Sequence, residues 1–131
     1  MHHKKIENLL KLSEDERLKF FVRYCADFEE VWGLVVEKDN WVTFTDSEND
    51  QIFPIWPHYD LAEYCCFSEH KKIKAMPQSI TLEVFLEKCV PDMKDANIYF
   101  GVFYDRNKKG LAISPDKLKL YLEDEIQKHS G

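Results

Sequence analysis

The chain has 131 residues, which is the length of one ordinary domain. Apolar residues make up 44% of it and aromatic residues 14%, so its core needs no metal ion or disulfide to complete it. A net charge of −6 argues against a nucleic-acid binder and against docking on anionic lipid, but it permits a basic protein partner.

Residues 1–12 are predicted to be an N-terminal tail or a short helix, and residues 13–131 a single domain. The first clear helix begins at Ser13, because Ser13 and Glu16 have the spacing of a capping box. Apolar side chains at helical spacing continue this helix to about Glu30. Its predicted buried face consists of Leu18, Phe21, Val22, Cys25 and Phe28.

Three strands are predicted to follow this helix in one sheet. Residues 31–36 and 41–45 are rich in β-branched and aromatic side chains, and the polar turn between them predicts a β-hairpin. Residues 52–56 are predicted to add a third strand. Pro54 places that strand at an edge or a bulge, because proline donates no backbone hydrogen bond. The acidic stretch 46–51 is interpreted as a solvated loop.

The middle of the chain is predicted to alternate between helices and a strand. Pro57 ends the third strand, and a helix is expected over residues 59–67. Residues 71–76 are predicted to form a further strand. The next helix begins at Thr81, whose hydroxyl is suited to cap it, and ends at Pro91.

The last third is predicted to be a hairpin followed by a helix. Residues 97–104 and 111–113 form the two strands, and Pro115 begins the helix. Tight turns join most of the strands. The whole series predicts an α+β fold in which about four helices pack on a mainly antiparallel sheet of about five or six strands. The apolar stripe of the last helix consists of Leu118, Tyr121, Leu122 and Ile126.

The four cysteines are expected to be reduced thiols. No Cys-x-x-Cys pair occurs, and the adjacent Cys65 and Cys66 are poorly placed to bond to each other. The N-terminal residues include no apolar signal segment, and no run is long enough to span a membrane. We therefore expect a cytoplasmic protein in which Cys25 and Cys65 fill the core.

Six short segments carry a family resemblance: Glu16–Phe21, Val31–Leu34, Phe53–His58, Ala62–Cys65, Leu82–Glu87 and Gly101–Phe103. The most specific are Val-Trp-Gly-Leu and Ile-Trp-Pro-His. In this order, from about Ser13 to Ile126, they resemble a bacterial family known only as the domain of unknown function number twenty-seven fifty. The resemblance implies a bacterial cytoplasmic protein and brings no established activity, cofactor or catalytic residue.

The strongest candidate site is the Trp-Pro-His-Tyr-Asp segment, where a strand leads into a helix. Its predicted partner-binding residues are Trp56, Pro57, His58 and Tyr59, with the tryptophan as the anchor. His58 could instead act as a general acid or base. The structural alternative is that Trp56 belongs to the core, Pro57 starts the helix, and His58 or Asp60 caps it.

Metal sites and nucleophiles are less favoured by the sequence. The group of His58, Cys65, Cys66 and His70 lacks the spacing of a zinc site, so we predict no metal and no cofactor. Cys66 is expected to be partly exposed near His70 and Lys71, which makes it a weak candidate nucleophile. No glycine-rich phosphate loop or other catalytic motif is present.

Two functional hypotheses from different classes follow. The favoured one is a non-catalytic protein-binding module, such as a regulator, an adaptor or an immunity-type inhibitor, whose acidic surface attracts a basic partner. The alternative is a small enzyme that uses His58 with Asp60 or Glu63. A homodimer formed through an exposed strand is a further expectation.

Overall fold

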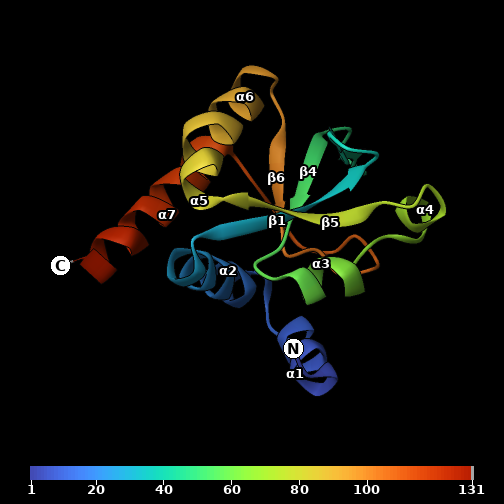
Figure 1. Cartoon of the computed structure of the whole chain (residues 1–131), viewed down its shortest axis with the longest axis horizontal. Helices are drawn as coiled ribbons and strands as arrows, with labels where there is room; N and C mark the ends of the chain where they lie inside the picture. The colour runs from blue at the N-terminus through green and yellow to red at the C-terminus, as the bar shows by residue number, and fades with distance from the viewer. Residues whose placement is uncertain (131) are drawn as a thin grey trace.

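Helices lie at both ends of the chain and the strands lie between them (Figure 1). The computed structural model describes the backbone of residues 1–130 and the side chains of residues 1–128. The helices are α1 (His3–Leu10), α2 (Glu14–Phe28), α3 (Tyr59–Tyr64), α4 (Ser68–Lys72), α5 (Leu82–Val84), the π-helix η1 (Phe85–Cys89), α6 (Val90–Asp95) and α7 (Pro115–Ser130). The strands are β1 (Glu30–Val36), β2 (Asn40–Trp41), β3 (Phe44–Thr45), β4 (Gln51–Ile55), β5 (Met76–Thr81), β6 (Tyr99–Val102) and β7 (Leu111–Ile113).

The described strands divide between two sheets within one α+β domain, which confirms the predicted class. Sheet A has the order β2-β1-β5 and is antiparallel throughout. Sheet B has the order β3-β4-β6-β7, and its central strands β4 and β6 run parallel. Parallel pairing is accessible here because the chain from α3 to α6 forms a long crossover between the two strands. The predicted strand 41–45 is split, since β2 pairs with β1 and β3 pairs with β4.

The two sheets meet at one pair of backbone hydrogen bonds. The Trp32 N–H donates to the Trp56 C=O at 2.9 Å, and the Trp56 N–H donates to the Trp32 C=O at 2.8 Å. The Trp56 side chain is 0% exposed, and its Nε1 donates to the Tyr104 C=O at 3.0 Å. Trp56 is therefore a core residue directly after β4, and its backbone joins sheet B to sheet A.

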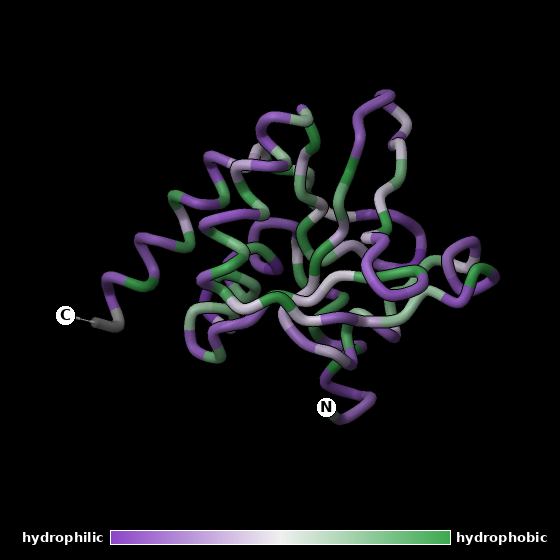
Figure 2. Tube along the Cα trace, turned by 45° about the horizontal axis from the view of Figure 1, so that its top comes forward, coloured by the Kyte–Doolittle hydropathy of each residue, from purple (hydrophilic) through white to green (hydrophobic). Residues whose placement is uncertain are grey.

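The predicted helix starts are present with their caps. Ser13 and Glu16 form a complete capping box at the start of α2. The Thr81 hydroxyl accepts from the Val84 N–H at 3.2 Å, as expected for an N-cap. In Figure 2, α7 alternates between hydrophobic and hydrophilic residues, and its Leu118 is fully buried. None of the described helices has both the length and the apolar character needed to cross a membrane.

Three predicted boundaries are wrong. The predicted helix 59–67 ends at Tyr64, and a separate helix, α4, begins at Ser68. The predicted strand 71–76 is occupied by the end of α4, and β5 begins only at Met76, after Lys74 has turned the chain with a φ of 60°. Pro91 does not end its helix, because it lies in the first turn of α6. The N–H of the preceding Val90 donates to the Phe85 C=O, five residues earlier, which is the wider π-helical pattern. The helix therefore has a π-bulge directly before Pro91.

Replacing Trp56 tests its place in the core. We expect Trp56→Phe to lower the free energy of unfolding by about 2–3 kcal/mol, because it leaves a cavity and removes the donor to the Tyr104 carbonyl. The matched control is Trp41→Phe, since Trp41 is only half-buried and should lose clearly less. Urea unfolding of both variants measures the difference, and equal losses would contradict the assignment.

Candidate functional site

Six ring side chains form two contacting groups that are joined by the sequence neighbours His58 and Tyr59, and we call the six together the aromatic surface. α2 and β1 supply most of them, and the start of α3 supplies the rest. Each ring contacts another ring of the set or neighbours one in sequence. The members are Phe20, Tyr24, Phe28, Trp32, His58 and Tyr59.

The α2 part of the aromatic surface follows from the spacing of its residues. Phe20, Tyr24 and Phe28 are each four residues apart, so they lie along one side of the helix. The ring centroids of Phe20 and Tyr24 are 5.5 Å apart, and those of Tyr24 and Phe28 are 4.4 Å apart, both stacked. Phe28 is the last residue of α2 and is 60% exposed, so its predicted place in the buried face is wrong.

The second part lies where β1 faces the start of α3. The Trp32 and Tyr59 rings meet edge to face, with centroids 5.4 Å apart. The His58 ring lies edge to face with Tyr24 at 6.0 Å and links the two parts. Tyr59 is 38% exposed, whereas Trp32 and His58 are half-buried. The patch therefore has a packed base with Phe28 and Tyr59 as its most accessible rings.

Carboxylates border the aromatic surface. Glu30 Oε1 accepts from the Trp32 indole at 3.2 Å, and Glu63 Oε2 accepts from the Tyr59 hydroxyl at 3.1 Å. Burial, followed by the charge of Glu30, raises the pKa of Tyr24. Rings rimmed by carboxylates favour lysine and arginine side chains, which can lie over a ring and pair with an acid.

Half of the predicted binding residues are absent from this surface. Trp56 and Pro57 are buried, so neither can serve as a surface anchor. His58 is the N-cap of α3, and its Nδ1 accepts from the Asp60 N–H at 3.0 Å. Of the predicted set, only His58 and Tyr59 belong to the aromatic surface. His58 caps α3 there, and Tyr59 presents an exposed ring.

The same geometry bears on the catalytic alternative. His58 Nδ1 already accepts a backbone hydrogen bond, so its 3.7 Å contact with Asp60 Oδ2 is no hydrogen bond. The Asp60 carboxylate instead accepts from the amino group of Met1, and Glu63 is bonded to Tyr59. A cavity of about 370 Å³ is lined by Asp60 and Glu63 but not by His58. Each of the three side chains is thus bonded to a group outside the proposed acid–base pair, and they form no poised pair.

The predicted thiol candidate is also corrected by burial. Cys66 is 5% exposed, and burial raises the pKa of its thiol. A buried thiol with a raised pKa is a poor nucleophile. His70 is buried as well, at 6% exposed, with its ring 5.3 Å from that of Phe67. Within the described residues, no group of three or more histidine, cysteine or acidic side chains could hold a metal ion.

Sequence reasoning missed Phe20, Tyr24 and Trp32 as members of the aromatic surface. The signal on α2 was the repeat of aromatic residues at every fourth position, beside the apolar stripe that fills the core. No comparable signal marks Trp32, because its place depends on which face of β1 is covered by α3. The sequence pattern therefore indicates the surface position of the residues on α2, and no pattern indicates that of Trp32 on β1.

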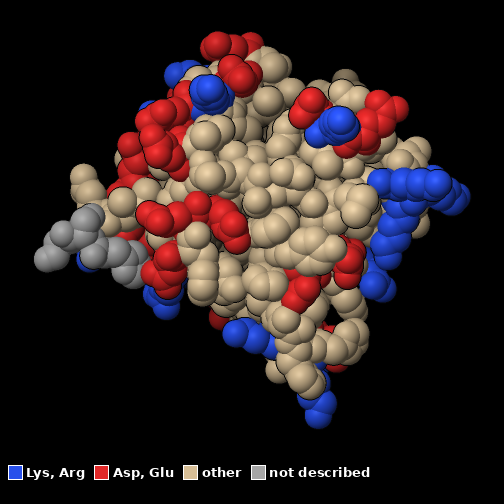
Figure 3. Space-filling view, viewed as in Figure 1, with Lys and Arg blue, Asp and Glu red and all other residues tan. Residues whose placement is uncertain are grey.

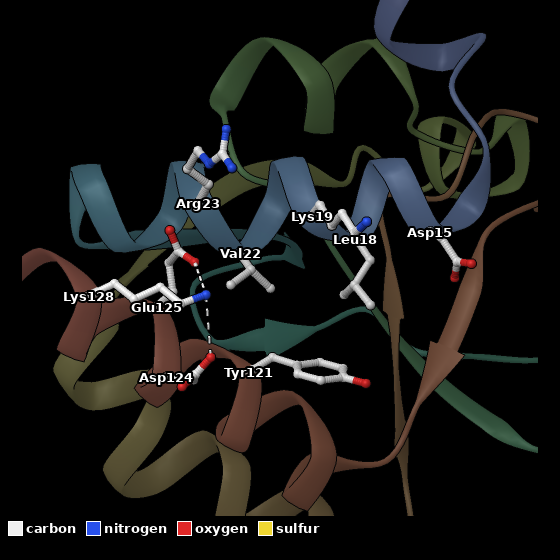
Figure 4. A pocket seen from close by; sticks show the side chains of 9 residues that line it. All are labelled: Asp15, Leu18, Lys19, Val22, Arg23, Tyr121, Asp124, Glu125 and Lys128. Carbon is white, nitrogen blue, oxygen red and sulfur yellow. Dashed lines mark ion pairs between the residues drawn. The ribbon is translucent and has the colours of Figure 1, made fainter.

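A groove of about 590 Å³ lies between α2 and α7 (Figure 4). Leu18 and Val22 of α2 and Tyr121 of α7 line its walls. At one end, Lys128 Nζ lies 3.5 Å from Asp124 Oδ2, one helical turn away on the same helix. Lys128 Nζ also lies 3.9 Å from Glu125 Oε2, so the charged groups at this end of the groove are paired with one another along α7. The aromatic surface is therefore the better candidate site.

The capping role of His58 can be tested directly. We expect His58→Ala to lower the free energy of unfolding by about 1 kcal/mol, because the Asp60 N–H loses its acceptor. His58→Asn should retain most of the stability, because asparagine is also a good N-cap. Urea unfolding of the two variants makes the comparison, and equal losses would argue that the imidazole itself is required.

His70 should make stability depend on pH. Burial is the main cause that lowers its pKa, and its Nδ1 has no hydrogen-bond partner. As the pH falls, this histidine takes up a proton in the unfolded state at a higher pH than in the folded state. The free energy of unfolding therefore decreases as the pH falls below about 6.5. We expect His70→Phe to lose less stability than the parent between about pH 7 and pH 5.

The control for this pH experiment is His3→Gln, because His3 is exposed on α1. It should follow the parent curve closely, since the ion pair of His3 with Glu7 is exposed and contributes little to stability. Thermal unfolding at a series of pH values provides the measurement. A parallel loss in His70→Phe and the parent would exclude His70 as the source.

Comparison with known proteins gives a family and no activity. No curated protein matches the chain, and no solved structure matches it. One family model does match, that of the family described as "Protein of unknown function (DUF2750)", over residues 18–122. This range covers most of the chain and includes most of α2, both sheets and the start of α7. The chain therefore belongs to the DUF2750 family, as its segments from Glu16 to Phe103 predicted.

Proposed function

We propose that this protein is a non-catalytic protein-binding module that holds a basic partner on its aromatic surface. The observation that carries the proposal is the patch of stacked rings with Phe28 and Tyr59 exposed and carboxylates at its border. A regulator, an adaptor or an immunity-type inhibitor would each use such a surface. Its described cysteines are free, which agrees with a reducing bacterial cytoplasm as its proposed compartment.

Exposed aromatic rings are the first argument for protein binding. Tyrosine and tryptophan are enriched among residues that dominate binding energy, because they bury a large area at a small cost in side-chain entropy. Phe28 is the last residue of α2 and is exposed, while its stacking on Tyr24 restricts its orientation. A partner that covered these rings would remove apolar area from water without reorganising the surface.

The charge around the rings is the second argument. Glu30 and Glu63 are held by hydrogen bonds to rings of the patch, so their positions are fixed before a partner arrives. The exposed residues Asp27 and Glu29 lie on either side of Phe28 in the sequence, at the end of α2. A lysine or arginine of the partner would be attracted by these carboxylates and could lie over a ring. Binding should therefore weaken as salt is added.

The test replaces the two accessible rings together. The tagged full-length chain is used to capture proteins from an extract of the source cell, in parallel with the double variant Phe28→Ser, Tyr59→Ser. We expect the variant to lose a specifically retained, basic protein by about tenfold or more, because both anchors are removed. Quantitative mass spectrometry of the retained fractions measures this loss.

The matched control is Leu120→Ser, since Leu120 is 64% exposed on α7 and lies outside the aromatic surface. It should retain the partner as the parent does, and added salt should release the partner from both. Circular dichroism checks that all three proteins are folded. The proposal fails if nothing is retained above background, or if the double variant retains the same proteins as the parent.

A further inference from the structure

β5 is an outer strand of sheet A, and some of its backbone groups point away from the sheet. Residues of antiparallel strands bond alternately to the neighbour on one side and to the other side. Trp32 bonds to the end of β4, and the Leu34 C=O accepts from the Val42 N–H at 2.8 Å, so both point away from β5. Their register partners Ser79 and Pro77 therefore direct their backbone groups outward.

The outward edge of β5 offers a short and restricted set of groups. Ser79 and Thr81 each carry a backbone N–H, but Pro77 has none. In the part of the chain that the structure describes, no strand pairs with this edge. A proline on an edge strand limits the registers in which another strand can add. Another strand can therefore pair with this edge, but the missing N–H of Pro77 limits the registers in which it can do so.

The two ends of β5 carry opposite charge. In Figure 3, lysine and arginine atoms gather over α4 at the right, and acidic atoms gather over α5, α6 and α7 at the left. β5 runs between these regions, from α4 to α5. The exposed cations just before it are Lys71, Lys72 and Lys74, and the exposed acids just after it are Glu83 and Glu87. The edge is thus polarised along its length.

We propose that two copies of this protein form a homodimer by pairing their β5 strands antiparallel, centred on Ser79. Antiparallel pairing about a two-fold axis places the basic end of each strand beside the acidic end of the other. Parallel pairing would bring like charges together at both ends. The polarity of the edge therefore fits a second copy of this chain in one orientation.

The proposed pairing uses the backbone groups that β5 leaves free. The Ser79 N–H of each copy would donate to the Ser79 C=O of the other, and the Thr81 N–H would donate to the Pro77 C=O of the other.

The first test is the mass of the protein in solution. Sedimentation equilibrium of the purified full-length chain should give a reversible dimer, with twice the 15.6 kDa mass of one chain. Ser79→Pro removes an outward donor and leaves the bonds to β1 in place, so it should give a folded monomer. A monomer for the parent at every concentration, or an undiminished dimer for folded Ser79→Pro, would overturn the proposal.

Charge reversal keeps the proposal testable if the proline variant fails to fold. The triple variant Lys71→Glu, Lys72→Glu, Lys74→Glu should raise the dimer dissociation constant by about tenfold or more, because acids then face acids. The variant Glu83→Lys, Glu87→Lys should weaken the dimer in the same direction. An equal mixture of the two should restore dimers, because each basic end again meets an acidic end.

The matched control places the same charge change on α1 and its C-cap, as Lys4→Glu, Lys5→Glu, Lys11→Glu, because these lysines are also exposed. It should dimerise as the parent does, which separates local pairing from net charge. If this control weakens the dimer as much as the triple variant does, or if the mixture stays monomeric, the β5 pairing is excluded.

Discussion

The pair of backbone hydrogen bonds between Trp32 and Trp56 is the constraint on which the rest of the structure depends. It joins two sheets at the point where β4 leads into α3. Because it occupies the backbone groups of Trp32, it fixes the alternation along β1 and hence which groups of β5 point outward. It also holds the Trp32 ring beside Tyr59, the first residue of α3. The buried core, the aromatic surface and the free edge thus follow from one contact.

A buried cation completes the arrangement by fixing α2 on sheet B. Arg17 Nη1 donates to the Phe103 C=O at 2.9 Å, just beyond β6, and its side chain is buried. Phe103 has a φ of 56°, an uncommon conformation for an aromatic residue. Arg17 lies on the same side of α2 as Tyr24 and Phe28, which follow about two and three turns later. An anchor at the start of the helix therefore sets the direction of the rings at its end.

Local features were predictable from the sequence, and long-range ones were not. Caps such as Ser13 and Thr81 depend on neighbouring residues, so their positions follow from spacing alone. The parallel pairing of β4 with β6 joins segments that are far apart in the chain, and no local pattern encodes it. His58 as a cap was one of the two structural alternatives in the sequence, and the bond that makes it a cap is local, from the Asp60 N–H to its Nδ1. Phe28 had the spacing of a core residue and is exposed because α2 ends there.

The aromatic surface and the β5 edge are neighbours, which gives the proposed dimer a functional consequence. Trp32 is in register with Ser79, so the two side chains project from the same face of sheet A. Pairing at Ser79 about a two-fold axis would place both copies of Trp32 on one face of a continuous sheet, about 14 Å apart at three strand spacings. Two aromatic surfaces so arranged would engage a partner with two basic segments at once. The second contact would then form at high effective concentration, so even modest sites would bind tightly together.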